Sequence, residues 1–363
     1  MKSELTAVQR LKLKILERGI VVDDRARKAL TRGGQQDLTH ADYPTTGGLT
    51  LQMPEDVYVN AQVIPALSST PAAALRVEDD DGRTSFLLQA GDTCVRVTPL
   101  PLPSYLRLDA AIHDGLMTHA DRARISPVGG CSVSCAFCDS PHADYRLRSA
   151  EHLIDALRLA IDDEALPPRH ALISGGTPCV ADRAYFDEVC ARVIRESPLP
   201  VDVMLAPRPD TDLVDRLVEW GVFGFSINLE LFSAGAAARF TPYKRGLGLN
   251  AFAHTIRRAV ELTGGDGRVR SLLLVGLEPI EETLRGVRFL AELGCDPCLS
   301  PFRPAAGTAL AHHPLPEAAL LEYVYLAAHE IAEEHGVKLG PRCIPCQHNT
   351  VSFPDDSGAF YYS

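Results

Sequence analysis

The sequence predicts an α/β protein built on a partial (β/α)6 barrel of the TIM type, with an N-terminal α+β extension. From about Arg124 onward, short apolar runs alternate six times with amphipathic helical patterns, as expected for parallel β/α units. The run Val269–Leu277 is almost uninterruptedly apolar, which is typical of a strand that is buried on both faces. The first 120 residues show neither feature, so we expect an extension over 1–120, a barrel over 121–346 and a tail over 347–363.

The extension begins with a helical pattern and continues with short strands. Apolar residues recur at helical spacing over Leu5–Leu30, and Gly33-Gly34 would end that helix. The stretch Ala41–Gly48 reads as a loop, and Asp81-Gly82 as a tight turn between two strands. The expected strands are Val57–Val59, Leu75–Val77, Ser85–Leu88 and Cys94–Thr98.

The barrel units follow one another with short connections. Helices are expected between successive strands and after the last one, the final helix covering Glu317–His335. In parallel barrels, functional residues gather at the carboxyl ends of the strands, so the residues that follow each strand are the first candidates. The expected strands are Ile125–Val128, His170–Ser174, Val201–Leu205, Val222–Leu231, Val269–Leu277 and Cys298–Phe302.

Composition narrows the class of protein. The formal net charge is −11, so the chain as a whole has no excess of positive charge with which to bind nucleic acid. A local basic patch is compatible with this net charge. No apolar run approaches the ~20 residues of a membrane span, and the first residues lack the layout of a signal peptide. Ten cysteines, three of them in one short motif, indicate metal binding in a reducing compartment, and we expect the cytoplasm.

Three cysteines follow the first predicted barrel strand at C-x3-C-x2-C spacing. They are Cys131, Cys135 and Cys138, and three thiolates on one loop can hold three irons of a [4Fe–4S] cluster while leaving the fourth iron open. A zinc site and three unrelated buried thiols are the alternatives. Structural zinc needs four ligands, and His142 is the only nearby candidate for the fourth. The cysteine spacing therefore favours an iron–sulfur cluster with one open position.

This motif resembles that of the radical S-adenosylmethionine (SAM) superfamily, over roughly residues 120–345. The aromatic Phe137 before the last cysteine also fits the pattern. The resemblance implies that the open iron binds SAM and that the reduced cluster cleaves it to a 5′-deoxyadenosyl radical. It also implies a small-molecule substrate and an external electron donor of the flavodoxin or ferredoxin type.

The strand ends offer candidates for SAM contacts. A glycine pair lets a backbone approach a ligand closely, and the pair after the second strand resembles the superfamily's "GGE" motif, with Thr in place of the acidic residue. Polar side chains on the fourth strand need partners, either SAM or an internal polar network. The end of the fifth strand partly resembles the region that packs on adenine. The candidates are Gly175, Gly176, Thr177, Asn228, Glu230, Val275 and Gly276.

Basic side chains near the strand ends have two interpretations. Lys244 and Arg245 follow the fourth strand and would bind a carboxylate or form a solvated loop. Arg208 follows the third strand and Arg303 follows the sixth. Each of these arginines would either bind substrate or form a structural ion pair. No residue is assigned a catalytic role beyond cofactor binding.

A second cysteine pair, Cys343 and Cys346, lies near the end of the chain at C-x2-C spacing. We expect it near the mouth of the barrel, with Cys298 and Cys179 as candidates to complete a second metal site. Biotin and lipoyl synthases, whose barrels this region resembles, carry an auxiliary iron–sulfur cluster. Their auxiliary cysteine patterns are absent, so a packed or redox-active pair is the alternative to an auxiliary cluster.

Three functions fit the sequence. The first is a radical SAM enzyme that abstracts hydrogen from a small organic molecule, for sulfur insertion or carbon-skeleton chemistry. The second is the same chemistry on RNA or on a carrier-bound substrate, which a basic patch at the barrel mouth would support. The third is a non-catalytic iron–sulfur or zinc protein. The glycine pair and the six βα units argue against the third, because holding a cluster needs neither.

Overall fold

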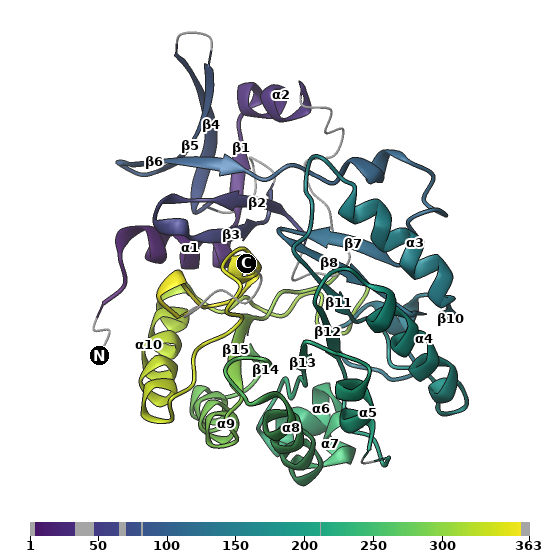
Figure 1. Ribbon diagram of the computed structural model, residues 1–363. Helices are drawn as coiled ribbons and strands as arrows, with labels where there is room; N and C mark the ends of the chain where they lie inside the picture. The colour runs from purple at the N-terminus through teal and green to yellow at the C-terminus, as the bar shows by residue number, and fades with distance from the viewer. Residues whose placement is uncertain (1–3, 33–46, 65–69, 81–82, 211, 357–363) are drawn as a thin grey trace.

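Two β-sheets organise the chain, a seven-stranded sheet in the barrel and a six-stranded sheet in the N-terminal part (Figure 1). The computed structural model describes residues 4–32, 47–64, 70–80, 83–210 and 212–356. The expected Gly33-Gly34 stop, the Asp81-Gly82 turn and most of the Ala41–Gly48 loop lie outside these residues.

The larger sheet confirms the partial (β/α)6 barrel. Its order is β15-β14-β13-β12-β11-β8-β7, and the six strands from β8 to β15 run parallel to their neighbours. Strand β7 pairs antiparallel with β8 and forms one edge, and β15 forms the other, so the barrel is open between them. The strands are β7 (Leu116–His119), β8 (Arg122–Ile125), β11 (His170–Ile173), β12 (Val201–Met204), β13 (Gly224–Ser226), β14 (Val269–Val275) and β15 (Asp296–Pro301).

Helices cover the outer face of this sheet, as the 3.6-residue apolar pattern requires. In α3, for example, Leu153, Ala156 and Leu157 are buried against the strands while the charged residues face outward. The helices of the barrel are α3 (Ala150–Ile161), α4 (Arg183–Glu196), α5 (Leu213–Glu219), α6 (Ala234–Phe240), α7 (Pro242–Leu247), α8 (Leu249–Thr263), α9 (Ile280–Glu292) and α10 (Ala318–Glu334).

Two parts of the barrel differ from the sequence-based expectation. The first strand, β8, starts three residues earlier than predicted, and β13 covers only Gly224–Ser226 of the expected Val222–Leu231. Beyond β13 the chain makes only an isolated bridge from Glu230 to Leu273 and turns at Glu230, whose φ is +70°. The two short helices α6 and α7 were not predicted. Each has fewer than eight residues, too few for a clear apolar period.

The N-terminal part confirms the mixture of helix and strand, but the predicted helix over Leu5–Leu30 is wrong. It is divided into α1 (Ala7–Arg18), β1 (Ile20–Val22) and α2 (Asp24–Arg32). Gly19 ends α1 with φ +66°, and Ile20 then donates its N–H to the Gln62 carbonyl at 2.8 Å. A Cβ at Gly19 would lie 2.5 Å from that carbonyl oxygen, so glycine is needed where the chain enters the sheet.

The smaller sheet has the order β1-β4-β5-β6-β2-β3, with β1 parallel to β4 and the remaining pairs antiparallel. The four strands predicted for this part are confirmed as β3 to β6 with bounds that differ by a few residues, whereas β1 and β2 were not predicted. The strands are β2 (Leu49–Gln52), β3 (Tyr58–Ala61), β4 (Ala73–Asp80), β5 (Arg83–Ala90) and β6 (Thr93–Pro99).

The segment after α10 joins the two sheets. Gly340 N–H donates to the Pro297 carbonyl at 2.8 Å, and Val351 N–H to the Leu299 carbonyl at 2.8 Å, so this segment follows β15. Lys12 of α1 is fully buried and donates to the carbonyls of Gln347 (2.8 Å) and Ser352 (2.7 Å). The C-terminal segment is therefore sandwiched between the barrel and the N-terminal part.

Candidate functional site

The residues 131–138, called the cysteine loop below, follow β8 and the two-residue strand β9 (Val128–Gly129). Cys131, Cys135 and Cys138 are free thiols and all three are partly exposed. The charges of Cys131 and Cys138 both add to the rise in the pKa of Cys135, which burial raises first and which reaches about 12. The loop carries the three thiols within eight residues of sequence at the carboxyl end of the first parallel strand, as the sequence predicts.

Hydrogen bonds from other strand ends hold the cysteine loop in place. Thr177 N–H donates to the Cys131 sulfur at 3.2 Å, and Ser132 N–H donates to the Thr177 carbonyl at 3.0 Å. Ala136 N–H donates to the carbonyl of Phe240, at the end of α6, at 2.8 Å. These bonds fix the loop between the ends of β11 and α6. An N–H that donates to sulfur also stabilises a thiolate there.

The glycine pair after β11 packs directly against the cysteine loop. A Cβ at Gly176 would lie only 1.7 Å from the Gly130 carbonyl oxygen and 2.9 Å from the Cys131 Cα. Gly175 has φ +124°, which side chains other than glycine rarely adopt. The glycine pair was predicted to let the backbone approach a ligand closely. In the structure it lets the end of β11 approach the cysteine loop. Its role as a contact for SAM stays a prediction.

An ion pair lies beside the cysteine loop. Lys244 of α7 is 2.8 Å from Glu230 Oε1 and donates to the Asn228 carbonyl at 2.7 Å. The Glu230 carboxylate contributes, after burial, to the raised pKa of both Cys135 and Cys138, so it lies close to their sulfurs. Glu230 Oε2 is buried and accepts no hydrogen bond from the residues that the structure describes. It is an acceptor for a donor that the described part of the chain does not supply.

Asn228 belongs to an internal network. Its Oδ1 atom accepts from Ser226 Oγ at 2.9 Å and from Leu272 N–H at 3.1 Å. The bond from Leu272 ties β14 to the polar stretch after β13, and the bond from Ser226 joins that stretch to the end of β13. The alternative of an internal polar network therefore accounts for the Asn228 side-chain oxygen, and its predicted contact with SAM rests on the remaining amide nitrogen.

The other predicted contacts lie around the same end of the barrel. Phe137 packs against a buried apolar cluster that includes Leu274 and Phe302. The Val275 carbonyl accepts from Phe302 N–H at 2.9 Å, which continues the β14–β15 ladder. Gly276 has φ +107°, and a Cβ added to it would lie 3.3–3.4 Å from the ring of Pro316. The region packs tightly, and its predicted contact with adenine stays a prediction.

Arg124 was missed by sequence reasoning. It projects from β8, is almost fully buried, and burial, aided by the nearby Arg148 charge, lowers its pKa to about 10. The Cys138 charge acts in the opposite direction, so Arg124 lies near that cysteine. A cavity next to the cysteine loop is lined by Arg124, Arg148, Gly130 and Gly176, among others. The available signal was an arginine alternating with apolar residues inside a strand that feeds the motif.

Two arginines have structural partners. Arg208 forms ion pairs with Asp187 (2.7 Å) and Asp210 (2.7 Å). Arg303 is buried and donates to the Asn60 side chain and carbonyl, both at 2.7 Å, so it joins the barrel to β3. For both arginines, these contacts fit a structural role rather than the binding of substrate.

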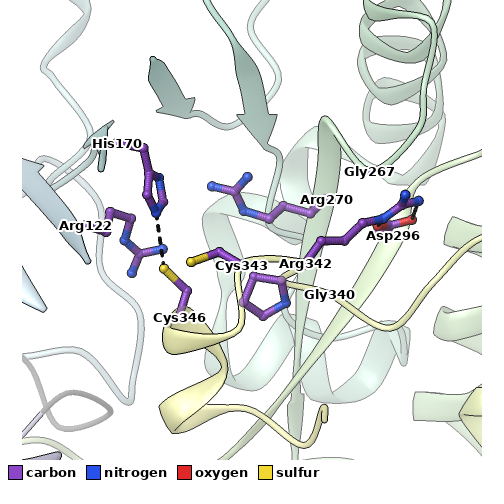
Figure 2. A pocket seen from close by; sticks show the side chains of 10 residues that line it. Arg122, His170, Gly267, Arg270, Asp296, Gly340, Arg342, Cys343 and Cys346 are labelled. Carbon is purple, nitrogen blue, oxygen red and sulfur yellow. Dashed lines mark hydrogen bonds and ion pairs between the residues drawn. The ribbon is translucent and has the colours of Figure 1, made fainter. Parts of the chain in front are cut away.

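The expected position of the second cysteine pair is wrong. Cys343 and Cys346 do not lie at the barrel mouth but at the amino ends of β8 and β11, beside Asp121 and His170. The C-terminal segment turns back along β15, as described above, and this return carries the pair to the opposite end of the strands from the cysteine loop. Figure 2 shows Cys346 facing His170, with Cys343 beside them.

The two other candidates for the second site lie elsewhere. Cys179 follows the glycine pair at the carboxyl end of β11, where its N–H donates to the Tyr145 hydroxyl at 2.9 Å. Cys298 lies within β15, with its sulfur 2.7 Å from a would-be Cβ of Gly340. The four buried side chains that converge are instead Asp121, His170, Cys343 and Cys346. Sequence reasoning missed Asp121 and His170 because each lies at the very start of its strand and more than 170 positions from the cysteines.

Comparisons with known proteins were made for the whole chain. No protein-family model matches it, and no curated protein matches its sequence. Solved structures similar to it include methylornithine synthase (PylB), at 16% identity and TM-score 0.48, over 66% of this chain and 73% of that one. A radical SAM methyltransferase from Sphaerobacter thermophilus is similar at 18% identity and TM-score 0.46, over 76% and 80%.

A third similar structure is the FeFe-hydrogenase maturase HydG from Carboxydothermus hydrogenoformans, at 16% identity and TM-score 0.47, over 62% of this chain and 56% of that one. Likeness at this level says nothing of substrate or reaction. Within the part of the chain that the structure describes, no helix is long and apolar enough to cross a membrane.

Proposed function

We propose that the chain is a radical SAM enzyme that binds a [4Fe–4S] cluster on Cys131, Cys135 and Cys138. The observation that carries the proposal is the cysteine loop itself. Three free, neighbouring thiols lie on one loop at the carboxyl end of the first parallel strand, where function gathers in such barrels. The donor set fits the group, because three thiolates leave one iron for a small molecule. When bound, the cluster would supply the electron that cleaves SAM.

The chain's own residues would position SAM and exclude water. Glu230 Oε2 is a buried acceptor without a hydrogen-bond partner among the described residues, and it would accept a hydrogen bond from an amino or ribose group. Lys244 holds the other Glu230 oxygen and thereby fixes the direction of the carboxylate. Gly176 keeps the cysteine loop and the β11 end in contact, and Arg124 places a buried positive charge near Cys138.

We propose hydrogen abstraction from a small organic molecule as the reaction. The Cys343–Cys346 pair lies at the far end of the strands, so it does not support a sulfur-donating cluster next to SAM. The proposal includes an external one-electron donor, because each reductive cleavage of SAM consumes one electron from the cluster. Ten free cysteines suit a reducing compartment such as the cytoplasm.

The test is reductive cleavage of SAM. The full chain is reconstituted anaerobically with iron and sulfide, reduced with dithionite and incubated with SAM, and 5′-deoxyadenosine is measured by chromatography. We expect its release by the wild-type protein and none by the Cys131/Cys135/Cys138→Ala variant. Cys94→Ala removes a thiol of β6, remote from the loop, and serves as the matched control. A protein that carries a full cluster and releases no 5′-deoxyadenosine would refute the proposal.

A further inference from the structure

Four buried side chains meet at the amino ends of β8 and β11, and the proposed SAM chemistry does not use them. They are Asp121, His170, Cys343 and Cys346, and their ligand atoms all lie within 4.8 Å of one another. We call these four residues the amino-end site. We propose that the amino-end site binds a single divalent metal ion, with Zn²⁺ as the preferred ion, through two thiolates, one imidazole and one carboxylate.

The distances between the donor atoms match the edges of a tetrahedron around one ion. Cys343 Sγ is 3.0 Å from Asp121 Oδ1, and Cys346 Sγ is 3.4 Å from both Asp121 Oδ1 and His170 Nε2. His170 Nε2 is 3.7 Å from Asp121 Oδ1. Zinc–sulfur bonds of about 2.3 Å and zinc–nitrogen or –oxygen bonds of about 2.0 Å give tetrahedral edges of about 3.3–3.8 Å. The four distances differ from the corresponding edges by at most about half an ångström, so small shifts of the side chains would accept the ion.

Asp121 is oriented as a monodentate ligand would be. Its Oδ2 atom accepts from Arg169 Nη2 at 2.5 Å and from Nε at 3.0 Å and lies 3.2 Å from Cys343 Sγ, while Oδ1 is the oxygen near both sulfurs and the imidazole. A carboxylate with one oxygen on the metal and the other held by a cation is the usual outer-shell arrangement of a metal ligand. Arg169 is exposed enough (41% for the side chain) to be changed without emptying the core.

The surroundings of the site suit a negatively charged ligand set. Two thiolates, one carboxylate and a neutral imidazole around Zn²⁺ carry a net charge of −1. Arg122 and Arg270 line the same small cavity as the cysteines, as Figure 2 shows. Arginine charges next to such a site offset its charge and favour the thiolate forms. Binding of the ion would release the two thiol protons to solvent.

The geometry argues against the other uses of a C-x2-C pair. An iron–sulfur cluster distributes its protein ligands over several irons and so keeps them farther apart than ligands of one ion. A dithiol redox pair uses only its two sulfurs, whereas here Asp121 Oδ1 lies 3.0 Å from Cys343 Sγ and His170 Nε2 lies 3.4 Å from Cys346 Sγ, so four donor groups converge as a metal ion requires. A cysteine nucleophile with a histidine base would need the carboxylate at the other imidazole nitrogen, whereas Asp121 faces Nε2, the atom that faces Cys346.

The ion would connect three segments that are distant in sequence. Asp121 precedes β8, His170 opens β11, and the cysteines belong to the segment that returns from α10. Lys12 anchors the same segment to α1 through Gln347 and Ser352. A metal at this point would fix the C-terminal segment beneath the open barrel and contribute directly to stability.

The experiment uses the full chain with the cysteine loop disabled, Cys131/Cys135/Cys138→Ala, so that its outcome does not depend on the proposed SAM chemistry. Zinc is measured by mass spectrometry after purification, and Co²⁺ is titrated into metal-free protein while thiolate-to-cobalt absorption is recorded. We expect about one zinc per chain and a tetrahedral cobalt spectrum. Adding Cys343→Ser should lower zinc affinity at least tenfold, and adding Cys190→Ala, a buried thiol of α4, should leave it unchanged.

Two further variants separate metal binding from folding. His170→Cys replaces one ligand by another and should retain zinc while increasing the thiolate absorption. Arg169→Ala leaves all four ligands in place and should weaken zinc binding by about 10–100-fold, as the loss of an outer-shell partner does. A folded protein that retains less than about 0.1 zinc per chain and shows no cobalt–thiolate absorption would overturn the proposal. So would an unchanged zinc affinity in a folded Cys343→Ser variant.

Discussion

The cysteine loop and the amino-end site lie at opposite ends of the same parallel strands and differ in how their thiols are surrounded. The loop cysteines are partly exposed, and their nearest partners are backbone N–H groups, a glycine pair and the Glu230–Lys244 ion pair. The cysteines of the amino-end site are buried against an imidazole and a carboxylate. Cysteine spacing alone therefore does not determine the kind of site. An open loop leaves room for a cluster and a ligand, whereas a closed set of four buried side chains fits one ion.

Burial also divides the two ends by role. At the carboxyl ends, the buried Glu230 Oε2 atom has no hydrogen-bond partner among the described residues, and Gly176 packs against Gly130 and Cys131. At the amino ends, Lys12 and Asp121 make hydrogen bonds that link segments distant in sequence. Changes at the carboxyl ends should therefore affect chemistry first, and changes at the amino ends should affect stability first.

The largest expected effect is the separation of the two sites by cysteine substitution. Cys135→Ala should reduce SAM cleavage to background, because a cluster with two protein thiolates is not retained, while zinc content stays the same. Cys346→Ser should remove zinc and lower the melting temperature, while iron at the cysteine loop persists. Iron, sulfide, zinc and 5′-deoxyadenosine measured on the same samples check both halves. Loss of both metals in either single variant would contradict independent sites.

Lys12 should make stability at the amino end depend on pH. Burial lowers its pKa to about 7, against the opposing charge of Asp356, while the unfolded chain keeps the ordinary value of 10.5. Between these two pKa values the folded state binds fewer protons than the unfolded state. The free energy of unfolding should therefore rise by about 3 kcal/mol from pH 7 to pH 10.

Denaturant unfolding of wild type and Lys12→Met over this range measures the contribution, because titration of other groups cancels in the difference. The variant also leaves the Gln347 and Ser352 carbonyls without their donor, which lowers its stability by a constant amount at every pH. SAM cleavage should change little. A wild-type stability that does not rise relative to the variant would show that Lys12 stays charged in the folded protein.

Gly176→Ala should disrupt the contact between the β11 end and the cysteine loop. The new methyl group would lie 1.7 Å from the Gly130 carbonyl oxygen, so one loop must move. Overpacking of this kind costs about 1–3 kcal/mol, and here we expect it to appear mainly as lower cluster content after reconstitution. Gly246→Ala in α7, where a Cβ meets nothing within 4 Å, is the matched control. Full cluster content in Gly176→Ala would contradict the packing role.

The smallest effect should come from Lys244→Met. Removing the ammonium group frees Glu230 Oε1 and the Asn228 carbonyl, so the Glu230 carboxylate is no longer held in one direction. We expect SAM affinity to fall about tenfold, which corresponds to about 1.4 kcal/mol, with cluster content unchanged. Equilibrium binding of SAM to the anaerobic holoprotein measures it. Lys244→Arg keeps the charge and should restore part of the affinity, whereas equal losses in both variants would point to a steric role.

Much of the barrel was predictable from the sequence, because six apolar strands alternate with helical patterns. His170–Ile173 and Val269–Val275 lie within one or two residues of their predicted bounds. The division of α1 from α2 was not predicted, since the apolar period continues through Gly19 and only tertiary pairing of Ile20 interrupts it. The cysteine loop was predictable because all its cysteines lie within eight residues.

The amino-end site was only half predictable. The C-x2-C spacing identified a cysteine pair, but its partners depend on where the C-terminal segment returns, which no local pattern encodes. Asp121 and His170 look like ordinary polar residues at strand starts, and Cys179 and Cys298 looked like better partners because they are cysteines. Arg124 was overlooked for a similar reason, since its burial follows from tertiary packing that its place in a short strand does not reveal.

The most direct test of the whole account is iron, sulfide and zinc per chain after anaerobic reconstitution, in wild type and in the Cys131/Cys135/Cys138→Ala variant. The account predicts about four irons and one zinc in wild type, and no iron with one zinc in the variant. About eight irons falling to about four would place an auxiliary iron–sulfur cluster outside the cysteine loop, and would contradict the assignment of the amino-end site to a single ion.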